Sequence, residues 1–285
     1  MRKRLIADIL RWIEEHLEEG INAASVEKIS GYTRRHLLTL FVQHTGFSPG
    51  QYIRSRRLSR SAFLLRLTNK KIIDIAYQLK FDSQQSFCRE FRKFFGCTPR
   101  QYRKASDWDF TKLKLPLVLD DLPIPAYEFC EMNSQFFSGF RLVSERKFNE
   151  KEQLVNSERY KNIILSLKIN KASVYVNTRF YASEERLSNL TINQFIGVVD
   201  SAQYSEANPM LEKFHSEGGE YLKVTFEGGW EEYAGLSKRI YHYLLPQLEL
   251  KRREGGDIEI FHYDDLKDPG EFVRCEYYIP VTAMS

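Results

Sequence analysis

Apolar residues recur at helical spacing through the first hundred residues of the chain. Leu5, Ile6, Ile9, Ile13 and Leu17 fall on one face of a helix, and further helical patterns follow with short polar breaks between them. From about residue 126 the pattern changes to short apolar runs, mostly of strand length, that turn residues separate. The pattern therefore predicts a helical first part and a mixed second part.

One helical unit occurs twice, about fifty positions apart. Residues 22–30 and 69–79 carry a first short helix, and after a break a second helix runs to Gly46 in one copy and to Gly96 in the other. Each copy therefore consists of a helix, a short turn, a second helix and a stop. The matched positions are the N-cap candidates Asn22 with Asn69 and Thr33 with Ser83, the buried pairs Leu37–Phe41 and Phe87–Phe91, and the closing Pro49, Gln51 and Tyr52 with Pro99, Gln101 and Tyr102.

The second helix of each copy carries side chains suited to DNA. In a helix-turn-helix this helix lies in the major groove, where Arg pairs with guanine, Gln with adenine, and a methyl group meets thymine. The positions outside the buried stripe hold such side chains, with Glu90 as one acidic exception. We expect base contacts from Arg35, Leu38, Thr39, Gln84, Gln85 and Arg89, and phosphate contacts from Arg34, Arg54, Arg57, Arg92 and Lys93.

The segment between the copies, residues 50–67, predicts an arginine-rich helix of about four turns. A rigid spacer would hold the two recognition helices at a fixed distance. They could then enter two adjacent major-groove segments of double-stranded DNA, about 34 Å apart. One chain, as a monomer or a weak oligomer, could read an asymmetric site.

The second half predicts an α+β fold. Prolines at 116, 123 and 125 favour a linker over residues 107–125, between an all-α tandem helix-turn-helix domain at 1–106 and a second domain at 126–285. The order of elements favours an antiparallel sheet with its helices on one face. Strands are expected at 126–132, 137–143, 173–182, 194–200, 220–228, 257–263 and 273–281, and helices near 151–168 and 231–248.

Charge separates the two halves. Residues 1–106 carry 21 Lys and Arg against 9 Asp and Glu, a net charge of +12, whereas the remainder carries 21 against 29, a net charge of −8. A basic block joined to an acidic one indicates that the first domain meets a polyanion and that the second has a different task.

Other features argue against an enzyme or a membrane protein. The four cysteines and six histidines show no metal-ligand spacing, and no phosphate-binding glycine motif occurs, so we expect no metal and no cofactor. Residues 46–50, GFSPG, fit G-x-S-x-G, but Ser48 follows a helix and precedes Pro49, which is the wrong context for a nucleophile. The cysteine usage favours a cytoplasmic setting, and no signal peptide or spanning segment is evident.

Residues 5–104 resemble the DNA-binding domain of the AraC/XylS family of bacterial transcription regulators, and most closely its MarA, SoxS and Rob subgroup. The tandem motifs, the IRSRRL linker helix and the block FDSQQSFCREFRKFFGCTPRQYR come in that family's order. The resemblance implies base-contacting roles for Gln84, Gln85 and Arg89, and RNA polymerase as a partner. The first recognition helix departs from the subgroup, which has Trp in place of Arg35 and a Gln-Arg pair in place of Leu38 and Thr39.

The second half resembles the GyrI-like effector-binding domain, attached as in the Rob branch of that subgroup, through the segments GGEYLKVTFEG, REGGDIEIFHY and VRCEYYIPV. The resemblance implies a cleft for small, often cationic or amphipathic effectors, with a carboxylate on the last strand. On that strand the apolar positions alternate with Glu276 and Tyr278, which therefore point to the other side of the sheet. The candidate ligand-binding residues are Glu276, Tyr278, Trp230, Tyr221, Phe195 and Tyr127, with Tyr204 beside them.

Three functions follow from these observations. The first is a ligand-tuned transcription regulator, an activator, that reads DNA. The second is a protein that binds or sequesters small molecules, in which the basic domain serves localisation. The third, an esterase-like activity of the second domain, has no support from a motif.

Overall fold

The computed structural model describes residues 2–106, 108–117, 125–147, 157–201, 210–248 and 250–282. These residues form two compact units. One unit contains residues 2–105 and 112–117, and the other contains residues 106–111 and the rest of the chain from 125 onward. The segment expected as a linker is therefore shared between the units. Within the described ranges, no helix has the length and apolar character needed to cross a membrane.

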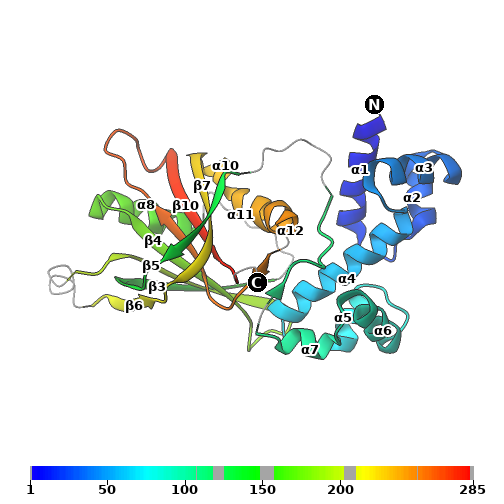
Figure 1. Cartoon of the computed structure of the whole chain (residues 1–285), viewed down its shortest axis with the longest axis horizontal. Coiled ribbons are helices and arrows are strands. Elements are labelled where there is room, and N and C mark those ends of the chain that lie inside the picture. The colour runs from blue at the N-terminus through cyan, green and yellow to red at the C-terminus, as the bar shows by residue number, and fades with distance from the viewer. Residues whose placement is uncertain are drawn as a thin grey trace. The chain divides into compact units, whose positions relative to one another are not determined.

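The first unit is entirely helical (Figure 1). Its central helix, α4, separates two helix-turn-helix pairs, α2–α3 and α5–α6, as the repeat predicts. The bounds are α1 Arg2–His16, α2 Ala23–Ser30, α3 Arg34–Thr45, α4 Pro49–Leu67, α5 Ile72–Gln78, α6 Gln84–Phe95 and α7 Pro99–Lys104.

Capping explains why the two copies end alike. Gly46 and Gly96 adopt left-handed backbone angles that close α3 and α6. Two residues later a capping box starts the next helix: Ser48 with Gln51 begins α4, and Thr98 with Gln101 begins α7. The Ser48 hydroxyl is thus used by a helix start, which accounts for the GFSPG sequence.

The starts of the earlier helices differ between the copies. Asn22 caps α2 as expected, whereas α5 begins at Ile72 with Lys71 in the N-cap position, so the prediction of Asn69 as a cap is wrong. Thr33 precedes α3 without a side-chain cap, and Glu27 Oε1 accepts a hydrogen bond from the Arg34 backbone N–H instead, at 3.1 Å.

A buried arginine network ties α1, α4 and residues 112–117 together. Arg56 donates from Nε and Nη2 to the two Glu14 carboxylate oxygens, at 2.7 and 2.8 Å, and from Nη1 to the Lys114 carbonyl. Tyr52 donates its hydroxyl hydrogen to Glu14 and accepts from the Leu117 N–H. Because both charges of the ion pair are bonded, their burial is tolerated.

The second unit is built on an eight-stranded antiparallel sheet in the order β2-β7-β10-β9-β4-β5-β3-β6, and a two-stranded sheet pairs β1 with β8. The bounds are β1 Trp108–Asp109, β2 Tyr127–Met132, β3 Gln135–Lys147, β4 Val174–Ala182, β5 Asn189–Val199, β6 Glu212–Ser216, β7 Gly219–Gly229, β8 Lys251–Arg252, β9 Asp257–Phe261 and β10 Phe272–Pro280.

The helices of this unit share one buried apolar cluster with the sheet. Ile163 and Leu167 from α8, and Tyr233 and Ile240 from the second helical segment, belong to the same cluster as Cys275 on β10. We call this side of the sheet the helix side. The helical elements are α8 Glu158–Asn170, α10 Trp230–Ala234, α11 Leu236–Arg239, the π-helical turn η1 Ile240–Leu244 and α12 Leu245–Gln247.

The other side of the sheet, which we call the aromatic side, carries a second buried cluster. Phe137, Tyr175, Phe195, Tyr221 and Tyr278 belong to it. Phe137 and Tyr175 stack with 3.7 Å between ring centroids, and Tyr175 donates a hydrogen bond to Ser216 Oγ at 3.0 Å. Both sides of the sheet therefore contain packed side chains.

Candidate DNA-binding face and ligand pocket

The first recognition helix, α3, presents the predicted base-reading residues to solvent. Arg35, Leu38 and Thr39 are exposed, whereas Leu37 and Phe41 are buried. The Thr39 hydroxyl donates to the Arg35 carbonyl at 3.0 Å. This bond uses the hydroxyl hydrogen, and the hydroxyl oxygen and the methyl group of Thr39 stay available to a partner.

The second recognition helix, α6, has the same arrangement. Gln84, Gln85 and Arg89 are exposed, and Phe87 and Phe91 are buried on the opposite stripe. Ser83 caps the helix by accepting a hydrogen bond from the Ser86 N–H at 3.1 Å. The structure therefore places all six predicted base-contacting residues on two solvent-exposed helix faces of one unit.

The predicted phosphate contacts fall into two groups. Arg34, Arg92 and Lys93 are exposed. Arg54 is exposed as well but forms a bidentate ion pair with Glu90 of α6, with 2.6 Å between Nε and Oε2. Glu90, the acidic residue within the second recognition helix, is thus already paired with a cation.

Arg57 makes hydrogen bonds within the first unit. Its Nε and Nη2 donate to the carbonyl oxygens of Leu17 and Ile21, at 3.0 and 2.9 Å. Partial burial lowers the pKa of this guanidinium. These hydrogen bonds hold the α1–α2 connection to α4, and a phosphate contact from Arg57 stays a prediction.

A basic pocket beside α6 was not predictable from the sequence. Its volume is about 440 Å³, and Gln84 lines it. Arg103 is held there by donating to the Leu65 and Lys70 carbonyls, at 3.1 and 2.6 Å. The other cationic residues at this pocket are Lys71, Arg100 and Lys104. They come from the ends of α5 and α7, which only the packing of the unit brings together.

On the aromatic side, Glu276 has three polar neighbours. Tyr278 donates its hydroxyl hydrogen at 3.0 Å, His262 Nε2 lies 3.2 Å away, and Lys223 Nζ lies 3.4 Å away. Lys223 also pairs with Glu128 at 2.5 Å. Partial burial raises the pKa of the Glu276 carboxyl, but these neighbours outweigh it and leave the pKa below its ordinary value.

Some of the candidate ligand-binding aromatics share a sheet face with Glu276, and two do not. Phe195, Tyr221 and Tyr278 lie in the aromatic-side cluster. Trp230 packs in the helix-side cluster, and its Nε1–H donates to the Pro269 carbonyl at 2.8 Å. Tyr127 pairs with Val224, a helix-side residue, so it points away from Glu276. The grouping of Trp230 and Tyr127 with Glu276 is thus wrong, and Tyr204 lies outside the described residues.

A cavity of about 240 Å³ lies on the helix side, around the buried carboxylate of Glu259. Arg159 and Tyr233 both donate hydrogen bonds to that carboxylate. Tyr160 and Tyr277 contribute aromatic walls. Glu259 was not predicted from the sequence, although it alternates with Ile258 and Ile260 on β9 and so lies on the same side as Asp257 and Phe261.

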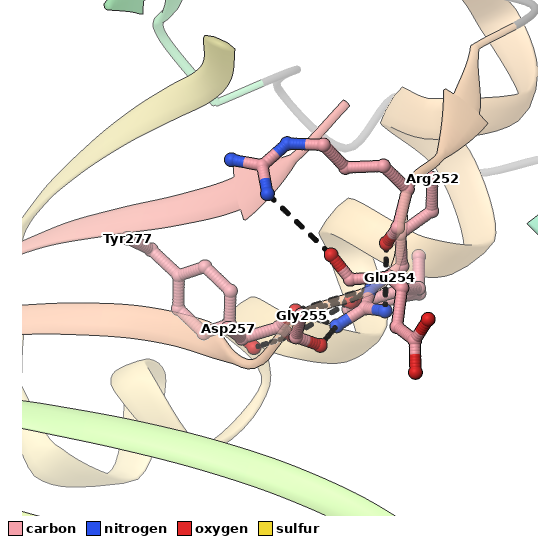
Figure 2. Close-up of polar contacts among 7 residues, drawn as sticks. Arg252, Glu254, Gly255, Asp257 and Tyr277 are labelled. Atoms are coloured by element: carbon pink, nitrogen blue, oxygen red, sulfur yellow. Dashed lines mark hydrogen bonds and ion pairs between the residues drawn. The ribbon is translucent and has the colours of Figure 1, made fainter. Parts of the chain in front are cut away.

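A second buried carboxylate, Asp257, bonds to residues of β8, η1 and β10 on the helix side of the sheet (Figure 2). It accepts hydrogen bonds from Tyr277 at 2.8 Å and from Tyr241 at 2.6 Å, and it forms an ion pair with Arg252 at 2.9 Å. Arg252 also donates to the Gly255 carbonyl at 2.8 Å. Tyr277 therefore connects the cavity wall to the turn between β8 and β9.

Two exposed recognition helices in one unit, and a helix-covered sheet with a cavity in the other, are the features of a DNA-binding regulator with a small-molecule domain. The chain matches the helix-turn-helix domain family over residues 27–105 and the GyrI-like small molecule binding domain family over residues 181–282. Transcriptional regulator Rob of Salmonella typhimurium is 32% identical, with 97% of this chain and 98% of that protein covered.

Two further relatives agree. The right origin-binding protein of Escherichia coli K12 is 31% identical over 97% of this chain and 98% of its own length. The F1 operon positive regulatory protein of Yersinia pestis is 31% identical over 99% of this chain and 89% of its own length. The chain belongs to the AraC family of DNA-binding transcription regulators, with the Rob-like order of domains.

Proposed function

We propose that this protein is a cytoplasmic transcription activator that reads two adjacent major-groove segments and recruits RNA polymerase. The observation that carries the proposal is the pair of exposed faces on α3 and α6 within one compact unit. Because one chain holds both recognition helices, a monomer suffices for an asymmetric site.

In this proposal Gln84, Gln85 and Arg89 read bases of one half-site. Arg35, Leu38 and Thr39 read the other, where the Leu38 side chain and the Thr39 methyl suit thymine methyl groups. Arg34, Arg92 and Lys93 contact phosphates and position the protein. The basic pocket around Arg100 and Lys104 adds phosphate contacts next to Gln84.

A small-molecule effector tunes this activity from the second unit. Two locations compete for it. A cationic effector at Glu276, against Tyr278, Tyr221 and Phe195, must displace Lys223 and His262, which already face the carboxylate. The helix-side cavity around Glu259 offers about 240 Å³ of space, so it is the better-supported location.

Selection of bound sites from a random duplex pool by the full-length protein tests the DNA-binding proposal. We expect a bipartite motif whose halves lie about one helical turn apart. Arg89→Ala should relax one half and Arg35→Ala the other. No enrichment by a folded protein would reject sequence-specific reading and favour the alternative, a small-molecule-binding protein with a basic localisation domain.

A further inference from the structure

Two large apolar side chains of the first recognition helix are exposed to water. Leu38 is 44% exposed and Val42 is 42% exposed, although α3 buries Leu37, Leu40 and Phe41 on its other side. A single exposed apolar residue is common on a protein surface and needs no explanation. Leu38 and Val42, however, are four positions apart, so their side chains are neighbours on successive turns of one helix. Together they form an apolar ridge that the packing of the unit does not use.

The ridge lies on the base-reading face of α3. Arg35, Leu38, Thr39 and Val42 are all exposed, and the last three follow Arg35 by three, four and seven positions. Side chains at these spacings lie on one face of a helix. Arg35 and Thr39 belong to the face that the proposed function places in the major groove. The ridge would therefore meet the edges of the bases in the same groove.

The second recognition helix has a different chemistry at the matched positions. Fifty residues further along the chain, these positions hold Gln85, Cys88, Arg89 and Arg92. Three of them carry exposed hydrogen-bond donors, and Cys88 is half-buried. Val42 stands where the second copy has Arg92, and a valine side chain bonds to neither a phosphate nor the polar edge of a base. The two helices of one unit thus present different chemical groups to DNA.

The groups that α3 presents are mainly methyl groups. Leu38 and Val42 have no polar atom in the side chain, and Thr39 adds a methyl group beside a hydroxyl that donates to the Arg35 carbonyl. The apolar feature that the major groove offers is the C5-methyl group of thymine. Leu38 and Val42 are separated by about 6 Å along the helix axis, and base pairs are stacked about 3.4 Å apart. The ridge is long enough to meet methyl groups on two or three adjacent base pairs.

We infer that the first recognition helix reads its half-site through the C5-methyl groups of thymine, which contact the ridge of Leu38, Thr39 and Val42, and that Val42 is a further specificity-determining residue. The inference rests on the proposed function and deepens it, because it names the chemical group that one half-site must contain. Arg35 supplies the hydrogen bonds at the amino end of the ridge. One chain then reads one half-site mainly by apolar contact and the other mainly by hydrogen bonds.

Replacement of thymine by uracil tests the contact with the methyl group. Uracil keeps every hydrogen-bonding group of thymine and lacks only the C5-methyl group. In the site selected by the full-length protein, the half that Arg35→Ala relaxes is the half read by α3. At each contacted thymine of that half, uracil should weaken binding about fourfold in fluorescence anisotropy, since one buried methyl group is lost. The factor should stay constant over a salt series, because no phosphate contact changes.

A double-mutant cycle assigns the contact to Val42. Val42→Ala should weaken binding to the selected site about fivefold, and it should reduce the effect of uracil to less than about twofold at the position that Val42 contacts. This loss of the uracil effect separates a direct contact from a change in DNA shape, which would persist in the variant. Val143→Ala removes the same groups from a valine of the second unit that is 58% exposed, and it should bind as the wild type does.

The outcomes separate this inference from the proposed function. A bipartite motif with no uracil effect in the half read by α3, or with equal uracil effects in the wild type and Val42→Ala, would overturn the inference and leave DNA reading in place. Wild-type DNA binding by Val42→Ala, together with a loss of activation by RNA polymerase in vitro, would overturn it in favour of a protein-contact surface. The absence of any selected motif would overturn the proposed function and this inference with it.

Discussion

Arg54 and Glu90 join the central helix α4 to the second recognition helix: Nε of Arg54 lies 2.6 Å from Oε2 of Glu90, and Nη2 donates to the other carboxylate oxygen. The pair combines an exposed cation with a largely buried acid at the edge of the proposed DNA-binding face. It links α6 to α4 and neutralises the charge of Arg54.

Glu90→Gln should therefore strengthen non-specific DNA binding. The change removes a negative charge near the phosphates and releases Arg54, so the slope of log K against log salt should steepen by about one. Fluorescence anisotropy on random duplexes over a salt series measures it. Glu231→Gln, which removes the same charge from the second unit, should leave the slope unchanged; an unchanged slope for Glu90→Gln would mean that Arg54 does not reach DNA.

Base-reading and phosphate-contacting residues of α6 should behave differently. Arg89→Ala should cost about 1–3 kcal/mol on the selected site and relax preference at one position. Arg92→Ala should weaken binding to all sequences by a similar factor and reduce the salt slope by about one. Affinities for the selected site and its single-base variants separate the two. The assignment of roles fails if the two variants give the same profile.

Removal of the buried Arg56 guanidinium should destabilise the first unit. Arg56→Met leaves the largely buried Glu14 without its cation and frees the Lys114 carbonyl, and breaking a buried ion pair costs about 3–5 kcal/mol. Urea unfolding followed by helical circular dichroism measures this loss. Arg54→Met, from the exposed pair on the same helix, should cost about 1 kcal/mol or less. Similar midpoints for the two variants would contradict the network.

A fall in pH should lower the stability of the second unit, in part because the Glu276 carboxylate becomes protonated. Its pKa in the folded protein lies below the ordinary value, so its contribution to stability is present above about pH 4.3 and is lost as the pH falls through the folded pKa. Glu276→Gln should therefore flatten the fall of the melting temperature between about pH 5 and 3. A variant curve parallel to that of the wild type would show that the neighbours Tyr278, His262 and Lys223 do not stabilise the ionised form.

Much of the first domain was predictable because its signals are local. Caps such as Ser83 and stops such as Gly46 and Gly96 act within one helical turn, and the buried stripes of α3 and α6 repeat at helical spacing. The exposure of Arg35, Gln85 and Arg89 follows from the same periodicity. The hydrogen bonds of Arg57 were not predictable, because they depend on carbonyl groups about forty positions away.

In the second domain, the alternation of residues along each strand could be read from the order of the amino acids, so the separation of Cys275 from Glu276 was predictable. Which face each strand shares with its neighbours depends instead on how the strands pair and pack. The register of β2 on β7 places Tyr127 on the helix side, and the packing of α10 places Trp230 there. The cavity around Glu259 and Arg159 joins residues a hundred positions apart, and no local pattern specifies such a pairing, because it depends on how α8 packs on the sheet.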